Sequence, residues 1–227
     1  MSYPDTRILT QPFATSGIIT RRNFLKASSM AAAGSLLLQG SPARAANFGS
    51  ERTLRFHNVH TDEELAIRCC PEKDYDRETR LRFSSLLRDH HADEVREMDP
   101  ALIDIFFAIS AFTGATGPFK ILSGYRSPET NSWLRGFHSG VAEHSMHIEG
   151  KAVDIRMDEI STRKLRSVGL ALAMGGVGYY PRSNFVHLDT GSIRHWPRMS
   201  HDQLARLFPD GKTVHVGTDG KQFPRYA

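Results

Sequence analysis

The spacing of apolar and polar residues divides residues 53–189 into short strands and helices. Residues 53–68 alternate in character around a polar turn at 61–63, which predicts a β-hairpin. Short apolar runs predict four further strands, at 119–122, 151–155, 177–180 and 185–189. Apolar residues at helical spacing predict helices over 77–96, 100–113, 128–137 and 162–173. Strands and helices are therefore interleaved along one segment.

Turn-forming residues mark the ends of these elements. Asp99-Pro100 has the pattern of a helix cap followed by a first-turn proline, and Gly114 ends the strongly apolar helix that follows. Ser161 is expected to cap the later helix, which Gly175-Gly176 ends. The tail after Arg198 is polar, with one short amphipathic segment around 204–208. The pattern predicts a single small α+β domain without internal repeats.

The N-terminal segment has the layout of an export signal. A basic stretch, Thr20-Arg21-Arg22-Asn23-Phe24-Leu25-Lys26, precedes a short apolar run over 27–38 and then a small-residue site ending at Ala45. The run is too short for a bilayer span of about 20 residues. The paired arginines resemble the twin-arginine signal, whose machinery would be a partner during transit. We therefore expect residues 1–45 to be removed after Ala45 and the product to lie in the periplasm.

Charge and composition exclude several classes of function. Residues 1–45 hold five basic residues and one acidic residue, which equals the whole formal excess of +4. The remainder is formally neutral, which argues against a nucleic-acid-binding protein. A mean hydropathy of -0.38 excludes a polytopic membrane protein, and no stable membrane insertion is expected. The only two cysteines, Cys69 and Cys70, are adjacent, which excludes a disulfide framework and favours a local packing or turn feature.

Three residues in apolar strands suggest a metal site. His147 precedes a predicted strand, Asp154 lies inside that strand, and His187 lies inside a later one. A carboxylate between apolar neighbours is costly to bury unless its charge is compensated, and a divalent metal would do so. Two histidines and one aspartate, with a fourth position left to water, are typical of catalytic zinc. The alternative is a hydrogen-bonded core histidine and an aspartate paired with an arginine, such as Arg126 or Arg156.

Several motifs together resemble a known family. They are Ser123-Gly124-Tyr125-Arg126-Ser127, Asn131, Gly140-Val141-Ala142, Ser145-x-His147-x-x-Gly150-x-Ala152-x-Asp154, and the stretch from Gly175 to His187 followed by Asp189-Thr190-Gly191. Their order and spacing resemble the zinc D-alanyl-D-alanine peptidases, and most closely the twin-arginine-exported murein endopeptidase K branch. The resemblance covers roughly 54–196, which leaves 197–227 as a polar C-terminal extension of a zinc peptidase domain over 46–227.

The resemblance implies a fold, a metal and a substrate. The fold would be a small α+β domain with a central antiparallel sheet that carries the zinc site. The Zn²⁺ ligands would be His147, Asp154 and His187, and the substrate would be the stem peptides of peptidoglycan. The bond cut would be the L,D bond of a 3-3 cross-link or the D,D bond of a 4-3 cross-link. Two alternatives stay open: a non-catalytic zinc-containing murein-binding module and a D,D-carboxypeptidase acting on uncross-linked stem peptides.

One departure from the superfamily concerns the general base. Many members carry Glu or Asp three residues before the second histidine, whereas this chain has Asn184, as the murein endopeptidase K branch does. Asp189 lies two residues beyond His187, so its side chain is expected on the same face of the strand, and it is our first candidate for the catalytic base. The alternative is that Asp189 orients a ligand histidine. His144 and Glu149 are the remaining candidates.

Two further residues are expected to meet the substrate. Arg126 follows a strand end and a glycine, and its guanidinium suits a stem-peptide carboxylate or a developing oxyanion. Ser145 is expected to hydrogen-bond the substrate or to brace its loop, and bracing is the expectation for Asn131. Trp196 is expected in the core or the wall of the cleft.

Overall fold

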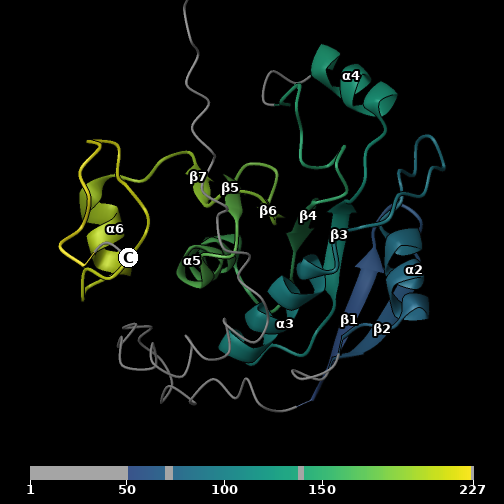
Figure 1. Ribbon diagram of the computed structural model, residues 1–227, viewed down its shortest axis with the longest axis horizontal. Helices are drawn as coiled ribbons and strands as arrows, with labels where there is room; N and C mark the ends of the chain where they lie inside the picture. Colours follow the sequence, from purple (N-terminus) through teal and green to yellow (C-terminus); the bar gives the residue numbers. More distant parts are fainter. Residues whose placement is uncertain (1–50, 70–73, 138–140, 226–227) are drawn as a thin grey trace, which may run out of the picture.

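The computed structural model describes residues 51–69, 74–137 and 141–225, and within them seven strands form one sheet that five helices accompany (Figure 1). The strands are β1 (Arg52–Asn58), β2 (Glu64–Cys69), β3 (Phe119–Ser123), β4 (Ala152–Arg156), β5 (Gly176–Tyr180), β6 (Phe185–Asp189) and β7 (Arg194–Trp196). The helices are α2 (Arg77–Leu86), α3 (Ala101–Thr113), α4 (Pro128–Phe137), α5 (Thr162–Leu172) and α6 (His201–Leu207). The predicted α+β class is confirmed.

The sheet is mixed rather than wholly antiparallel. Its strand order is β2-β1-β3-β4-β6-β5-β7. The pairs β1/β2, β3/β4, β4/β6 and β5/β6 are antiparallel, whereas β1/β3 and β5/β7 are parallel. In each parallel pair other elements separate the two strands in the chain: β2, α2 and α3 lie between β1 and β3, and β6 lies between β5 and β7. The four central strands, β3, β4, β6 and β5, are antiparallel as expected, and they carry the site.

The core lies between the sheet and helices α2, α3 and α5. Four fully buried phenylalanines, Phe56, Phe83, Phe106 and Phe119, contact one another edge-on or stacked, with ring centroids 4.7–6.2 Å apart. Ala101 N donates to the Asp99 carboxylate at the start of α3, and Gly114 ends that helix in the left-handed conformation with φ 73°. The predicted end of this helix is confirmed, whereas its start lies one residue later than predicted, with Pro100 instead of Asp99 at the N-cap.

Strand alternation divides the sheet into a helix-facing side and an opposite side. Gly169 of α5 packs against Leu188 and Val177, because a Cβ at Gly169 would meet both side chains at 3.1–3.2 Å. His187 is adjacent to Leu188 along β6, so its side chain lies on the opposite side. Asp154 lies opposite His187 on β4 and shares that side. The face away from α5 therefore holds the polar residues of the central strands.

The helix predicted over 77–96 is shorter in the structure, ending at Leu86. Asp89 explains the end, because its Oδ1 accepts from the backbone N–H of His91 and, at a longer distance, of Ala92. Asp93 has a left-handed backbone with φ 53°, which does not occur within an α-helix. The prediction was wrong here because the helical spacing of apolar residues continues to Val95. Two backbone N–H groups beyond the end of α2 instead bond to an aspartate side chain. Two elements, β7 and α6, were not predicted as a strand and a helix.

Some predictions fall on residues outside the described ranges. These are the export signal over 1–45, Cys70 and Gly140. Cys69 is described and is fully buried at the end of β2. No helix in the described part of the chain is long and apolar enough to cross a bilayer.

Candidate metal centre

A single row of residues crosses the sheet at the level of the candidate site. In the register of the strands, Ser123 pairs with Asp154, Asp154 with His187, His187 with Gly178, and Gly178 with Trp196. Directly paired residues project on the same side of a sheet. The row therefore places a carboxylate and an imidazole side by side on two central strands. These are Asp154 and His187.

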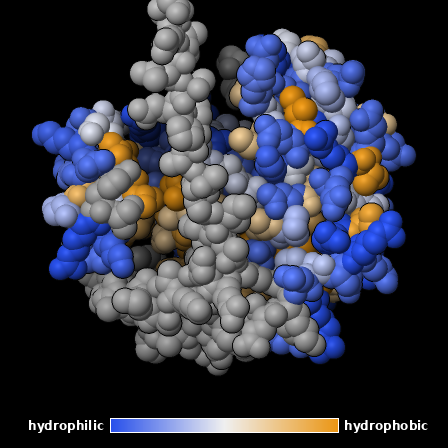
Figure 2. All heavy atoms as spheres, in the orientation of Figure 1, coloured by the Kyte–Doolittle hydropathy of each residue, from blue (hydrophilic) through white to orange (hydrophobic). Residues whose placement is uncertain are grey.

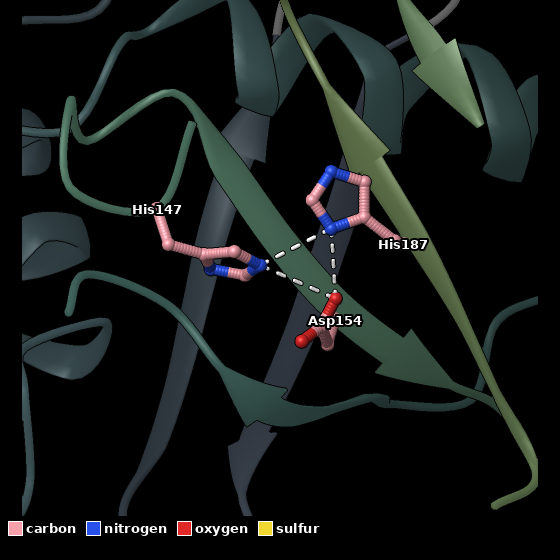
Figure 3. Close-up of side chains that lie close together, drawn as sticks. All are labelled: His147, Asp154 and His187. Carbon is pink, nitrogen blue, oxygen red and sulfur yellow. Dashed lines mark hydrogen bonds and ion pairs between the residues drawn. The ribbon is translucent and has the colours of Figure 1, made fainter. Parts of the chain in front are cut away.

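A tight loop brings the third residue to this pair. Backbone hydrogen bonds from Ile148 to Ser145 O and from Gly150 to His147 O fold the chain just before β4. Gly150 has φ 68°, a conformation that glycine adopts without strain. His147 projects from this loop toward Asp154 and His187, as Figure 3 shows. All three predicted metal ligands are thus brought together.

The three side chains converge through one atom each. His147 Nε2 lies 3.1 Å from His187 Nδ1 and 3.3 Å from Asp154 Oδ1. His187 Nδ1 lies 2.9 Å from the same carboxylate oxygen. Ligand atoms in a tetrahedral zinc site with bonds of about 2.0–2.2 Å lie about 3.3–3.6 Å apart. The cluster therefore matches a metal site after an outward shift of a few tenths of an ångström.

The remaining ring nitrogens fix both histidine tautomers. His147 Nδ1 lies 2.6 Å from the carbonyl oxygen of Gly124, and His187 Nε2 lies 3.1 Å from Asp189 Oδ2. Because both partners only accept hydrogen bonds, we place a proton on each of these nitrogens. His147 Nε2 and His187 Nδ1 are then lone-pair donors that face each other and a carboxylate oxygen. Three buried acceptors with no hydrogen between them require a cation.

The directions of the pKa shifts also indicate that the cluster favours a positive charge. Burial lowers the pKa of His147. Burial alone would also lower the pKa of His187, but hydrogen bonds to Asp154 and Asp189 raise it above its usual value. Burial would raise the pKa of Asp154, yet the two histidines hold it well below its usual range. The cluster therefore keeps Asp154 ionised and attracts a cation, which is a proton when no metal is bound.

Asp189 lies behind His187 instead of beside the ligand atoms. It is fully buried, and its oxygens accept from His187, from both terminal nitrogens of Arg194 at 3.0 and 2.7 Å, and from the backbone of Gly176 and Gly191. Although burial would raise it, hydrogen bonds from His187 and Arg194 lower the pKa of Asp189 to about 2. Our first expectation, a catalytic base, does not suit a carboxylate so placed, because it contacts the ring nitrogen on the far side of His187.

Arg126 reaches the cluster through Asp154. Its Nη2 donates to Asp154 Oδ2 at 2.5 Å and its Nε donates to Ser123 Oγ at 2.8 Å. The side chain is 15% exposed. The pairing of Asp154 with an arginine, which the sequence offered as an alternative to a metal site, therefore coexists with the histidine cluster. Arg126 contacts Oδ2 of Asp154, whereas the two histidines contact Oδ1.

The other candidate residues brace loops or lie at the surface. Ser145 is buried and its Oγ accepts from His147 N at 3.3 Å, while Asn131 Nδ2 donates to Ala142 O at 3.1 Å. Asn184 is an exposed turn residue with φ 53°, a conformation that asparagine tolerates better than most residues. His144 is exposed, and the exposed Glu149 pairs with Lys151 Nζ at 2.8 Å.

Two further residues contact the site: Trp196, which was expected in the core or the wall of the cleft, and Arg194, which was not predicted. Trp196 lies over His187 with ring centroids 5.0 Å apart, and its indole nitrogen donates to Tyr180 Oη at 2.8 Å. Gly178 makes room for this indole, because a Cβ there would lie 2.6 Å from the ring. Arg194 donates to both oxygens of Asp189, including the Oδ2 that faces His187. Its position five residues after Asp189, beyond a glycine turn, was the only signal in the sequence.

Comparisons with known proteins identify a family for the chain. The family model described as peptidoglycan L,D-endopeptidase MepK matches residues 46–196. The chain is 39% identical over 145 residues to the peptidoglycan L,D-endopeptidase MepK of Escherichia coli strain K12, covering 64% of this chain and 80% of the relative. It is 38% identical over 146 residues to the probable peptidoglycan L,D-endopeptidase MepK of Haemophilus influenzae, covering 64% and 78%. No solved structure matches the chain significantly.

Proposed function

The chain belongs to the peptidoglycan L,D-endopeptidase MepK family of M15 peptidases, and we propose that it hydrolyses the L,D bond of 3-3 cross-links in peptidoglycan with one zinc ion. The observation that carries the proposal is the convergence of His147 Nε2, Asp154 Oδ1 and His187 Nδ1 within 2.9–3.3 Å of one another. The names of the relatives support the substrate. The donor set, two imidazoles and one carboxylate, supports zinc.

Each residue of the cluster and its neighbours has a separate role in the proposed reaction. His147, Asp154 and His187 would hold the zinc ion, which would supply Lewis acidity and lower the pKa of a water molecule at the site. Asp189 holds His187 in the tautomer that leaves Nδ1 unprotonated, and Gly124 O does the same for His147 Nε2. Both roles are positioning roles, and the assignment of Asp189 follows the second of the two possibilities raised by the sequence.

Arg126 is the substrate-binding residue of this proposal. Its contacts with Asp154 and Ser123 use Nε and Nη2, so the N–H donors of Nη1 are left for a ligand. A guanidinium fixed at one edge can bind a stem-peptide carboxylate or the oxygen that becomes negative during hydrolysis. Ser145, which braces the backbone of His147, keeps the metal loop in place instead of binding substrate.

Digestion of defined cross-linked dimers tests the proposal. Zinc-loaded protein is expected to cleave 3-3 dimers, to leave 4-3 dimers largely intact, and to lose activity with a chelator or with His147→Ala. Cleavage of 4-3 dimers alone would move the activity to the D,D bond, and release of D-alanine from a pentapeptide would indicate a carboxypeptidase. If no substrate is cleaved by protein that holds zinc, the chain is a binding module and the proposal is wrong.

Substitution then locates the proton acceptor. His144 and Glu149 lie on the loop that carries His147, and neither forms part of the buried cluster. His144→Ala and Glu149→Gln each remove one candidate without touching a ligand. A loss of kcat of about 10²–10⁴ at unchanged zinc content identifies the residue that transfers the proton.

The proposal places the enzyme outside the cytoplasm, where peptidoglycan lies. Residues 1–45 act in it as a twin-arginine signal, and the peptidase domain begins at residue 46, which is also where the family match begins. Replacing Arg21 and Arg22 by lysine is expected to leave full-length precursor in the cytoplasm. Normal delivery of that variant to the periplasm would refute this part of the proposal.

A further inference from the structure

Five rings form a continuous array on the surface beside the Arg126 segment. They are His60, His90, His91, Trp133 and Phe137, and successive ring centroids lie 4.1, 4.1, 5.5 and 5.2 Å apart. We call these five residues the ring array. Trp133 and Phe137, one helical turn apart on α4, are 55% and 70% exposed. Such exposure of an indole and a phenyl ring side by side is typical of a binding surface.

A shallow pocket with mostly apolar walls opens at the middle of the ring array. Its volume is about 310 Å³, and it is lined by His91, Glu129, Thr130 and Trp133. The pocket combines ring faces with a carboxylate, which accepts hydrogen bonds and repels anions. A matching ligand therefore has C–H groups on a flat face, O–H or N–H donors at its edge, and no negative charge.

The ring array is rigidly connected to the candidate metal centre. Asp89 is buried, and its Oδ1 accepts from His91 N at 2.9 Å while its Oδ2 accepts from Ser127 N at 2.8 Å. Ser127 follows Arg126 directly. At the other end, His60 Nε2 bonds to Leu122 O, next to the Ser123 that accepts from Arg126. A ligand bound on the ring array is thus held at a fixed distance from the catalytic groups.

The chemistry of the ring array favours a neutral sugar. Nucleic-acid bases also stack on exposed rings, but their binding grooves are basic, and this pocket carries Glu129. A protein partner would need about 800 Å² of complementary surface. On the right half of the face shown in Figure 2, the hydrophobic areas are small and separate. Pyranose rings offer a C–H face with hydroxyl and acetamido donors at the edge, and they are neutral.

We propose that the ring array is a glycan subsite, which binds the acetamido sugars of the strand that bears the cleaved stem peptide. The inference rests on the proposed function for the identity of the strand, but its contacts are separate from the metal centre. Stacking on Trp133 and hydrogen bonds to Glu129 hold the sugar, and Asp89 fixes the subsite relative to Arg126. The subsite adds binding energy for substrates within intact glycan and none for isolated peptides.

Two substrates with the same cross-link test the inference. One is a cross-linked dimer of stem peptides that still carry their disaccharides, and the other is the same dimer without sugars. Trp133→Ala is expected to lower kcat/KM about three- to tenfold for the sugar-bearing dimer and to leave the sugar-free dimer unchanged. Leu81→Ala is the matched control, since Leu81 is 50% exposed on α2, away from the ring array. An equal effect on both dimers overturns the inference.

Direct binding separates failure of this inference from failure of the proposed function. Peptide-free oligomers of N-acetylglucosamine are titrated into zinc-loaded protein and followed calorimetrically. Wild-type protein is expected to bind them saturably, and Trp133→Ala and His91→Ala to weaken that binding. Binding without any cleavage of dimers would retain the subsite and reject the endopeptidase. Cleavage of 3-3 dimers with no oligomer binding would retain the endopeptidase and reject the subsite.

Discussion

Replacing Asp189 by asparagine separates a positioning role from a catalytic one. Asp189 Oδ1 accepts from Gly176 N, Gly191 N and Arg194 Nη1, so the oxygen of the new amide is held at that position by three donors. The amide nitrogen then replaces Oδ2, the atom that faces His187 Nε2 at 3.1 Å. Two N–H groups cannot both donate to each other, so the His187 proton is forced to Nδ1. That nitrogen is the one directed at Asp154 and His147.

The size of the effect follows from these contacts. Loss of a partner that orients a metal-bound histidine costs 10- to 100-fold in metal affinity, or about 1.4–2.8 kcal/mol. Arg194 also loses a charged partner, but its side chain is 38% exposed, so water replaces much of that interaction. We therefore expect zinc affinity to fall 10- to 100-fold while the fold is retained.

Zinc competition against a chromophoric chelator measures this affinity, and circular dichroism at the same pH monitors the fold. Asp158→Asn is the matched control, because Asp158 is 71% exposed and pairs with Lys120 at the surface. This control is expected to bind zinc like the wild type. If Asp189→Asn keeps wild-type zinc affinity but loses kcat by 10² or more, Asp189 transfers a proton and the tautomer argument is wrong.

Three further predictions concern stability. Gly178→Ala is expected to displace the Trp196 indole and to lower the free energy of unfolding in urea by about 1–3 kcal/mol. Gly136→Ala is the control, because a Cβ at Gly136 meets nothing within 4 Å, and it is not expected to destabilise the protein. Equal losses of stability in the two variants would contradict the packing argument. Burial lowers the pKa of His195 to about 4, whereas the same ring takes up a proton near pH 6.5 in the unfolded chain. The free energy of unfolding is therefore expected to fall by up to about 3 kcal/mol as the pH falls from 6.5 toward 4. Acid titration of His195→Gln should show a flatter decline, and an unchanged slope would refute the assignment. Zinc at 100 times its Kd is expected to stabilise the folded protein by about 2.7 kcal/mol, raising Tm in wild type but much less in His147→Ala.

The sequence predicted the strands of the site because their neighbours are apolar on one side only. Val153 and Ile155 flank Asp154, and Val186 and Leu188 flank His187, so the alternation placed both polar residues on one face of a sheet. The pairing of these strands at one level depends on the strand order, which alternation does not determine. The family resemblance supplied that link.

Other features depend on contacts between distant segments and could not be read from the pattern. The orientation of Asp189 depends on Arg194 and on two backbone amides that meet it only after folding. Likewise, Asp89 looked like part of a helix, but its side chain bonds the backbone of Ser127, which lies 38 residues away. In both cases a buried carboxylate found its partners through tertiary structure, whereas periodicity reports only local spacing.

The placement of β6 between β4 and β5 makes the three-residue cluster depend on a late part of the sequence. His147 and Asp154 lie close together in the chain, whereas His187 follows α5 and β5 and meets them only because β6 pairs with β4. A chain ending before residue 185 would contain His147 and Asp154 but could not form the cluster. It would also leave the edge of β4 unpaired, which is a template for association with other chains. The pairing that completes the cluster is therefore also the one that protects this edge.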